Sequence, residues 1–247
     1  MMQADFYMEI AGYVACVSPQ FASTRHYFSD YLTRKEGDFS ISVTREAMEF
    51  EQAFALEEAR QEGIRPRLYD GAHLERATIQ RAFAEFLFDR DVLLLHGSTV
   101  AVDGKAYLFT AKCGTGKSTH TRLWRHVFGD RAVMVNDDKP FLKLTDAGIF
   151  ACGSPWSGKH GLHSNVCLPL QGICILERGA ENVISPMAQA DAIKMLLRQA
   201  YEPVDPAKKP KQEALVRRLA EMVPLWHMDC NKDPSAAQIA HAAMSGE

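Results

Sequence analysis

The sequence predicts an α/β fold built on a mixed β-sheet, and two kinds of signal lead to this class. One is a pair of hairpins near the centre: an Asp103-Gly104 turn joins two extended apolar runs, and an Asp146-Ala147-Gly148 turn joins two more. The other is a strand, a glycine-rich loop and a helix-like run in succession over residues 105–128. Hairpins among strand–helix units indicate a mixed sheet, because uninterrupted alternation would give a purely parallel one.

The length and composition are those of an ordinary globular protein. The chain has 247 residues, of which 47% are apolar and 24% are charged. These values exclude the disordered, collagen-like and coiled-coil classes. We expect a single domain over residues 1–247, with an N-terminal strand–helix lobe over residues 1–90 and a core over residues 91–247.

Charge and cysteine usage restrict the partners and the compartment. The formal net charge is −3, so no excess of positive charge favours nucleic acid or anionic lipid. No apolar run approaches the roughly 18 to 20 residues of a membrane helix, and the apolar stretch 10–17 follows Asp5 and Glu9 rather than a basic segment. The six cysteines form no C-x-x-C pair, which predicts reduced thiols and a cytoplasmic protein.

The regions on either side of the centre are predicted from apolar spacing. Residues 6–17 and 38–44 are typical of strands, and residues 73–90 have apolar side chains at helical spacing. Towards the C-terminus we expect these elements in order: a strand over 172–177, a helix over 188–200, a Pro- and Lys-rich connector over 202–211, a helix to about 222, a strand over 224–228 and a closing helix after 234. The connector's lysines are interpreted as a solvated surface, with a phosphate-attracting loop as the alternative.

The central glycine-rich loop nearly matches the phosphate-loop pattern G-x-x-x-x-G-K-[ST], with Ala111 in place of the first glycine. Glycines allow backbone N–H groups to face a phosphate, and the next helix N-terminus adds a positive dipole end. Lys117 would contact the β and γ phosphates, and Ser118 offers a hydroxyl to Mg²⁺. The alternative is a structural glycine turn. The predicted nucleotide-binding residues are Cys113, Gly114, Thr115, Gly116, Lys117, Ser118 and Thr119.

Three further residues are expected beside this loop. Asp137 and Asp138 follow an apolar strand, where paired carboxylates can hold a metal and accept a proton from a hydroxyl. We assign Asp137 to the metal with Ser118, while which aspartate is the base stays open; N-D-D as a plain turn is the alternative. His96 ends another strand and could reach the same crevice to bind a second metal or relay a proton, unless it is a structural histidine.

Residues 152–163 form a glycine-rich, basic segment with one large aromatic side chain. Trp156 is predicted to line the pocket of a phosphoryl acceptor, together with Ser157 and His160, while Lys159 balances charge on the transferred group. The alternative is a core tryptophan and a solvated lysine. His160 and His163 have a spacing that a metal could use, but no neighbouring ligand completes a zinc set.

The order H-G-x-x-V, hairpin, G-T-G-K-S-T and D-D resembles the HPr kinase/phosphorylase and phosphoenolpyruvate carboxykinase superfamily, and most of all the small kinases related to HPr kinase. The similarity is strongest from His96 to Asp138, and residues 152–163 resemble the G-x-P-W-S-G-K segment of those kinases. It implies a phosphate-loop core on a mixed sheet over residues 91–247. It also implies that His96, Lys117, Ser118 and the pair Asp137 and Asp138 occupy catalytic positions, and it implies a homo-oligomer.

Together these features predict an ATP- and Mg²⁺-dependent kinase that transfers the γ-phosphoryl group to a hydroxyl of a small molecule or peptide. Asp138 or its neighbour would accept the hydroxyl proton, and Lys117 and Mg²⁺ would spread the developing charge. Two alternatives stay open. One is carboxykinase-like chemistry, against which the short chain argues, and the other is a non-catalytic nucleotide-binding regulatory protein.

Overall fold

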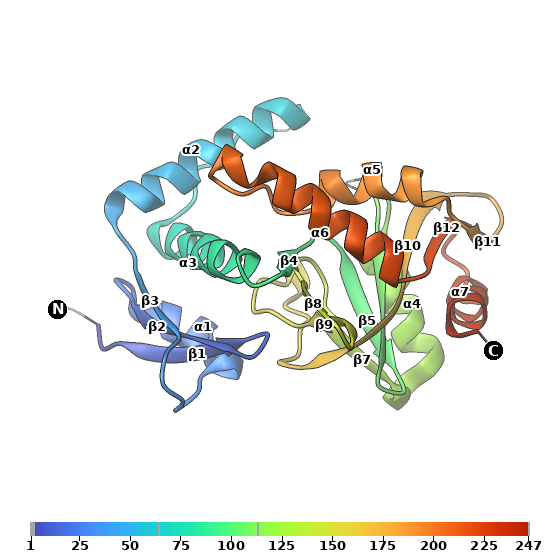
Figure 1. The fold of residues 1–247 in the computed structure, drawn as a ribbon, viewed down its shortest axis with the longest axis horizontal. Helices are drawn as coiled ribbons and strands as arrows, with labels where there is room; N and C mark the ends of the chain where they lie inside the picture. The colour runs from blue at the N-terminus through green and yellow to red at the C-terminus, as the bar shows by residue number, and fades with distance from the viewer. Residues whose placement is uncertain (1–2, 64, 113, 247) are drawn as a thin grey trace. The chain divides into compact units, whose positions relative to one another are not determined.

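The computed structural model describes residues 3–63, 65–112 and 114–246. The chain is a mixed α/β protein that divides into two compact units, Met1–Leu87 and Phe88–Glu247. Each unit contains one sheet with both parallel and antiparallel strand pairs, so the predicted mixed-sheet class is confirmed at this level. Figure 1 shows the succession of elements within each unit.

The N-terminal unit pairs a three-stranded sheet with helices. Its elements are β1 (Phe6–Ile10), β2 (Tyr13–Ser18), α1 (Ala22–Tyr27), η1 (Ser29–Tyr31), β3 (Phe39–Ser42), α2 (Arg45–Glu62) and α3 (Gly71–Phe88). The expected strands at 6–17 are a hairpin, because Ala11 and Gly12 adopt positive φ angles of 54° and 85° between them. The helix expected over 73–90 is α3, which buries Ile79, Phe83 and Leu87; α2 was not predicted.

The C-terminal unit is built on a nine-stranded sheet. Its strands are β4 (Val92–Leu94), β5 (Ser98–Val102), β6 (Lys105–Thr110), β7 (Ala132–Asn136), β8 (Phe141–Thr145), β9 (Gly148–Cys152), β10 (Cys167–Arg178), β11 (Val183–Pro186) and β12 (Leu225–Cys230). The helical elements are α4 (Lys117–Phe128), η2 (Gly129–Arg131), η3 (Gly158–His160), α5 (Gln189–Gln199), η4 (Pro206–Lys208), α6 (Lys209–Met222) and α7 (Ser235–Ser245).

Both predicted central hairpins are confirmed. The strands β5 and β6 pair antiparallel from Ser98↔Phe109 to Val102↔Lys105, and β8 pairs antiparallel with β9. At the first turn Asp103 and Gly104 have φ angles of 50° and 78°, the two positive values that a tight two-residue turn between twisted strands requires.

The strand order brings three parallel strands to one edge of the sheet. The order is β4-β8-β9-β10-β6-β5-β7, and β12 pairs with the C-terminal half of β10. Because β6 and β12 both run parallel to β10, the carboxyl ends of these three strands lie at the same edge. The glycine-rich loop leaves the sheet at that edge, directly after β6.

Helices cover the two faces of this sheet with separate apolar cores. One core joins Leu108 and Ile175 of the sheet to Leu196 of α5 and Leu219 of α6. The other joins Phe109 to Trp124 of α4 and Ala240 of α7. Alternation of side chains along β6 explains why consecutive residues Leu108 and Phe109 enter different cores. The helix that follows the glycine-rich loop is therefore held by a core of its own.

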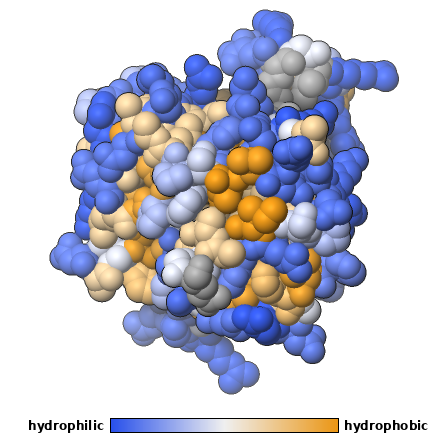
Figure 2. Space-filling view, turned by 90° about the vertical axis from the view of Figure 1, so that its right-hand side faces the viewer, coloured by the Kyte–Doolittle hydropathy of each residue, from blue (hydrophilic) through white to orange (hydrophobic). Residues whose placement is uncertain are grey.

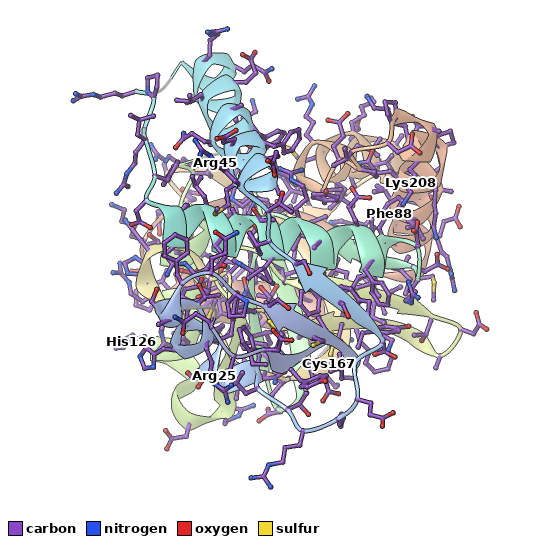
Figure 3. All side chains as sticks on the ribbon, turned by 90° about the vertical axis from the view of Figure 1, so that its left-hand side faces the viewer. Arg25, Arg45, Phe88, His126, Cys167 and Lys208 are labelled. Atoms are coloured by element: carbon purple, nitrogen blue, oxygen red, sulfur yellow. A yellow bond between two sulfur atoms is a disulfide. The ribbon has the colours of Figure 1, made fainter. Side chains whose placement is uncertain are left out.

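The expectation of reduced thiols is wrong for one pair. Cys152 at the end of β9 and Cys167 at the start of β10 form a disulfide (Figure 3). They are 15 residues apart in sequence, but antiparallel pairing of β9 with β10 places them directly opposite each other. The disulfide closes the segment 153–166, which contains the residues predicted to contact a phosphoryl acceptor. Cys16, Cys174 and Cys230 are free thiols.

The lysines of the 202–211 connector lie at the surface and pair with carboxylates of the same unit. Lys208 pairs with Asp89, and Lys211 pairs with Asp91, at 2.9 and 3.0 Å. Lys208, labelled in Figure 3 together with Phe88, also has its Nζ atom 6.0 Å from the centre of that ring. These contacts favour the interpretation of the connector as a solvated, ion-paired surface.

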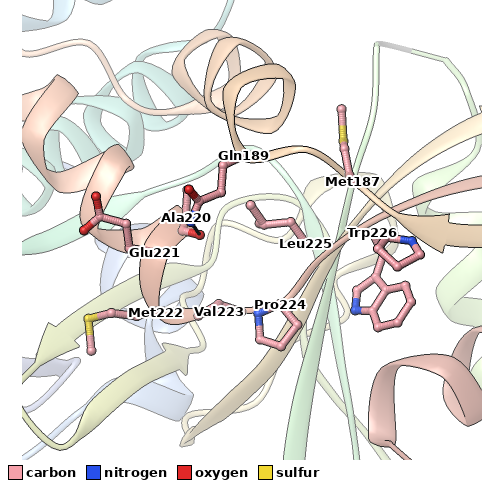
Figure 4. Close-up of a pocket in the computed structure, with 10 residues that line it drawn as sticks. Met187, Gln189, Ala220, Glu221, Met222, Val223, Pro224, Leu225 and Trp226 are labelled. Atoms are coloured by element: carbon pink, nitrogen blue, oxygen red, sulfur yellow. Dashed lines mark hydrogen bonds between the residues drawn. The ribbon is translucent and has the colours of Figure 1, made fainter.

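Across the described part of the chain, no helix combines the length and the apolar character needed to cross a bilayer. The surface drawn in Figure 2 is mixed, with interrupted groups of apolar residues among hydrophilic ones. One shallow groove lies where α6 ends and β12 begins, and Figure 4 shows Met222, Leu225 and Trp226 among its lining. Because it adjoins the amino end of β12, this groove lies away from the edge that carries the glycine-rich loop.

Candidate functional site

The glycine-rich loop has the backbone that its sequence predicts. Gly114 and Gly116 adopt φ angles of 74° and 124°, which residues with a Cβ atom rarely reach. Thr115 turns back on the loop, because its N–H and its hydroxyl both donate to the carbonyl of Lys112, at 3.2 and 2.8 Å. The helix α4 begins immediately afterwards at Lys117. Cys113, which the sequence also assigned to nucleotide binding, lies outside the described residues.

Buried aromatic contacts fix the first turns of α4. His120 and Trp124 are 2% and 0% exposed, and the indole N–H of Trp124 donates to His120 Nε2 at 3.1 Å. The His120 ring also lies 4.5 Å from the ring of Phe109 in β6. Burial lowers the pKa of His120 to about 4, so this side chain is neutral near pH 7. The N-terminus of α4, with its outward-facing N–H groups, is thereby held rigidly at the edge of the sheet.

The predicted aspartate pair follows β7, and Asn136 shapes its backbone. The Asn136 side-chain oxygen accepts from the N–H groups of Asp138 and Lys139, at 2.8 and 2.6 Å. This Asx turn, which N-D-D turn chemistry predicted as an alternative, presents the aspartates at the sheet edge. The Asn136 amide donates to the carbonyls of Ser154 and Trp156, so β7 also holds the start of the 153–166 segment.

Asp137 is buried and lies beside the start of α4. It is 6% exposed, and its Oδ1 accepts a hydrogen bond of 2.7 Å from the hydroxyl of Ser98, which in turn lies 2.8 Å from the hydroxyl of Thr121. Among the ion pairs of the described residues, none involves Asp137. A buried carboxylate without a basic partner favours a bound cation. Carboxylate and hydroxyl oxygens from Asp137 and Ser118 are the donors that Mg²⁺ prefers, so these residues fit that ion.

Asp138 is more accessible and faces positive charge. Its side chain is 32% exposed, and its Oδ1 lies 3.3 Å from His96 Nε2. Burial raises the pKa of Asp138, but the hydrogen bond from His96 and the charges of Lys139, His96 and Lys117 outweigh it, leaving the pKa below its usual 3.8. The predicted residues His96, Lys117 and Asp138 therefore share one electrostatic environment.

Backbone hydrogen bonds hold His96 in this position. Its N–H donates to the carbonyl of Gln199 at 2.8 Å, and its own carbonyl accepts from the hydroxyl of Thr110 at 3.0 Å. The next residue, Gly97, donates its N–H to the carbonyl of Asp138 at 3.0 Å. The end of β4 and the end of β7 are thus tied together through main-chain contacts at the loop edge.

The segment predicted to contact the acceptor divides into a buried part and an exposed part. Trp156 is 7% exposed and packs edge-on against Phe141 at a ring distance of 6.5 Å, as a core side chain does. Ser157 is 3% exposed, whereas Lys159 and His160 are exposed on η3.

Gly158 brings η3 close to the aspartate pair. A Cβ atom at Gly158 would lie 3.4 Å from the Cβ of Asp138, and its φ of 67° favours glycine. The exposed Lys159 follows directly, so a basic side chain is carried on a turn that packs against Asp138. The glycine-rich sequence of this segment did not by itself indicate which residue Gly158 would approach.

Three residues of this region were not predicted as site residues. Ser98 bridges Asp137 and α4, and Asn136 shapes the aspartate turn. Arg178, at the end of β10, donates to the loop carbonyls of Gly114 and Thr115, at 2.5 and 3.4 Å. Of the three, the N-D-D sequence gave a signal for Asn136, while Ser98 and Arg178 come into place through strand pairing that is not visible in the sequence.

Comparison with known proteins gives matches among solved structures only. No family model matches the chain, and no curated protein matches it. Among solved structures, the HPr(Ser) kinase/phosphatase from Coxiella burnetii matches with a TM-score of 0.38 and 11% sequence identity, over 62% of this chain and 97% of that chain. A likeness at this score assigns neither a family nor an activity to this chain.

Proposed function

We propose that the C-terminal unit binds ATP with Mg²⁺ and transfers the γ-phosphoryl group to a hydroxyl of a small molecule or peptide. The observation that carries the proposal is the meeting of three features at one sheet edge: a glycine loop leading into α4, the Lys117 charge, and the aspartate pair. The glycine angles and the helix N-terminus suit a phosphate chain, because both present backbone N–H groups to an anion.

The roles follow from burial and charge. Lys117, at the first residue of α4, would neutralise charge on the β and γ phosphates. Ser118 and the buried Asp137 would hold Mg²⁺, which when bound would neutralise charge on the phosphates and so reduce their repulsion of the nucleophile. Asp138, more exposed than Asp137, is assigned as the base that accepts the hydroxyl proton, with His96 orienting its carboxylate.

The acceptor side is assigned to η3. Its exposed side chains, Lys159 and His160, lie on the turn whose Gly158 approaches Asp138, so an acceptor held there would be within reach of the base. Lys159 would add positive charge for the transferred group. The burial of Trp156 favours a supporting role beneath this turn rather than direct contact with an acceptor.

The test is incubation of the full chain with γ-labelled ATP, Mg²⁺ and a panel of hydroxyl compounds, including free serine, inositols and serine-containing peptides. The proposal predicts labelled product with at least one hydroxyl compound and none with Lys117→Ala. A parallel incubation with oxaloacetate detects carboxykinase-like decarboxylation. Tight ATP binding without transfer to any compound or to water would favour the regulatory alternative and contradict the kinase assignment.

A further inference from the structure

A second group of metal-ligand side chains lies at the carboxyl ends of β10 and β12. It consists of Glu177 from β10 and of His227 and Asp229 from β12. One ligand atom from each residue lies within 4.8 Å of the others, and His227 Nε2 is 3.7 Å from Glu177 Oε2. We refer to these three residues as the β12 triad.

The pairing of the two strands accounts for this convergence. In the parallel register Glu177 lies beside Asp229, and Ile175 lies beside His227. Residues paired in this way point to one face, and residues two apart on a strand share a face, so all three side chains project together. On its other side β12 pairs with β11, which places Ser185 beside His227. A strand paired on both sides holds its side-chain directions firmly.

A glycine at the end of β10 leaves room for the aspartate. A Cβ atom at Gly179 would lie 2.8 Å from the Cβ of Asp229, closer than real Cβ atoms approach. The Gly179 N–H also donates to the carbonyl of Cys230 at 3.0 Å, which extends the strand contact past the triad. Asp229 therefore occupies a fixed place that any larger residue at 179 would disturb.

The charges of the triad favour a cation. Two carboxylates side by side on one face repel each other, and this arrangement destabilises a sheet. Within the described residues, the ion pair that these carboxylates make is the contact of Glu177 with His227. The nearest arginine in sequence, Arg178, points to the other face and donates to carbonyls of the glycine-rich loop. The two carboxylates therefore add electrostatic attraction for a cation to the ligand geometry.

We propose that Glu177, His227 and Asp229 form a binding site for a divalent transition ion, Zn²⁺ in the first place, with water in the remaining positions. One imidazole nitrogen and two carboxylate oxygens suit Zn²⁺ or Mn²⁺, whereas Mg²⁺ prefers oxygen ligands alone. Zn²⁺ should bind more tightly than Mn²⁺ in the usual affinity order of divalent ions. The side chains of His227 and Glu177 are 29% and 59% exposed, which gives the ion a path from solvent.

The β12 triad is distinct from the Asp137 and Asp138 pair. The pair follows β7, which is separated from β12 by β10, β6 and β5. Four strand spacings of about 4.8 Å put the two places roughly 19 Å apart along the sheet edge. The proposed ion therefore does not depend on nucleotide, and its failure would leave the proposed kinase function untouched.

The test is calorimetric titration of the chelator-treated full chain with Zn²⁺, in the absence of nucleotide. We expect one site whose affinity falls by more than about tenfold in His227→Ala and in Asp229→Asn. His126→Ala, which removes an exposed histidine of α4, and Asp191→Asn, which neutralises an exposed carboxylate of α5, serve as matched controls and should bind Zn²⁺ like the wild type. Thermal melting without metal verifies that each variant is folded.

Each arm of this experiment can overturn the proposal. Failure of the wild type to bind stoichiometric Zn²⁺, or unchanged binding in a folded His227→Ala variant, would contradict it. Titration with Mn²⁺ should give weaker binding at the same site. Mg²⁺ binding that equals that of Zn²⁺ and is lost in Asp229→Asn would also contradict it, because the imidazole would then contribute nothing.

Discussion

An Asp138→Asn substitution should reduce turnover far more than it reduces ATP affinity. A positioned general base contributes about 10²- to 10⁴-fold to a rate, and the contribution falls as the base becomes weaker. Because His96 and Lys117 help to hold the pKa of Asp138 below 3.8, we expect the lower part of this range, about 10²- to 10³-fold. This loss corresponds to roughly 3 to 4 kcal/mol in the barrier.

The substitution leaves the surroundings nearly intact. Asn has the shape of Asp and keeps an oxygen that can accept from His96 Nε2, which lies 3.3 Å from Asp138 Oδ1. The pKa of Asp138 is lower in the folded protein than in the unfolded chain, where it is about 3.9. The ionised carboxylate therefore stabilises the fold at pH values above about 3.9, and this stabilisation is lost as the pH falls through the pKa of the folded state. At neutral pH the variant should therefore lose catalysis and some stability without unfolding.

The assay measures kcat and KM for ATP and for the acceptor from about pH 5 to about pH 9, where Asp138 is ionised throughout. Protonation of Asp138 should therefore cause no fall in the kcat of the wild type at the acidic end of that range. Asp137→Asn is the matched control, and it should instead raise the Mg²⁺ concentration required for half-maximal rate. Collapse of ATP affinity in Asp138→Asn, with turnover of bound ATP preserved, would refute the assignment of Asp138 as the base.

The remaining predictions concern the segment between β9 and β10. Trp156→Ala should lower the free energy of unfolding by about 3 to 5 kcal/mol in urea titrations, because it empties a buried site against Phe141; a loss below about 1 kcal/mol would place the indole outside the core. Cys152→Ser should cost about 3 kcal/mol in the chain-entropy model for a loop of this length, an effect that vanishes when wild type and variant are compared in reductant. Lys159→Ala should lower turnover with the acceptor and with water alike while preserving the melting temperature, and an effect confined to acceptor KM would contradict its role on the transferred group.

Local chemistry explains which parts of the fold were predictable. The β5–β6 hairpin follows from Asp103 and Gly104, since the turn needs two positive φ angles and these residue types tolerate them. The loop before α4 follows in the same way from Gly114 and Gly116. In each case the sequence itself contains the conformational requirement, so no distant contact is needed to predict the element.

Elements that depend on distant contacts were missed. The helix α2 has mostly exposed, Glu-rich turns, and its local signals lie at its two ends: the Thr44 side chain accepts from the Ala47 N–H at 3.2 Å, and Gly63 ends the helix with a φ of 67°. The short strand β11 exists because β12 pairs with it. The disulfide between Cys152 and Cys167 requires the β9–β10 register, and no spacing rule for cysteines indicates it.

The candidate sites show the same division. The phosphate-loop pattern and the aspartate pair are contiguous in sequence and could be found by inspection, whereas the partners of Asp137 could not. Ser98 reaches Asp137 because β5 and β7 are neighbours, although 39 residues separate them in sequence. The β12 triad is similar, because Glu177 and Asp229 become neighbours through parallel pairing of β10 with β12, and the connection between these strands contains β11, α5, η4 and α6.

Calorimetric titration of ATP in the presence of Mg²⁺ into the wild type and a Lys117→Ala variant tests the central claim most directly. Lys117 begins α4 at the end of the glycine-rich loop, and its charge helps to lower the pKa of Asp138. A lost charged contact to phosphate is worth about 1.5 to 3 kcal/mol, so one-to-one binding by the wild type should weaken about 10- to 150-fold in the variant. No saturable binding of ATP to the wild type, or equal affinity in the folded variant, would contradict the assignment of this loop to nucleotide phosphates.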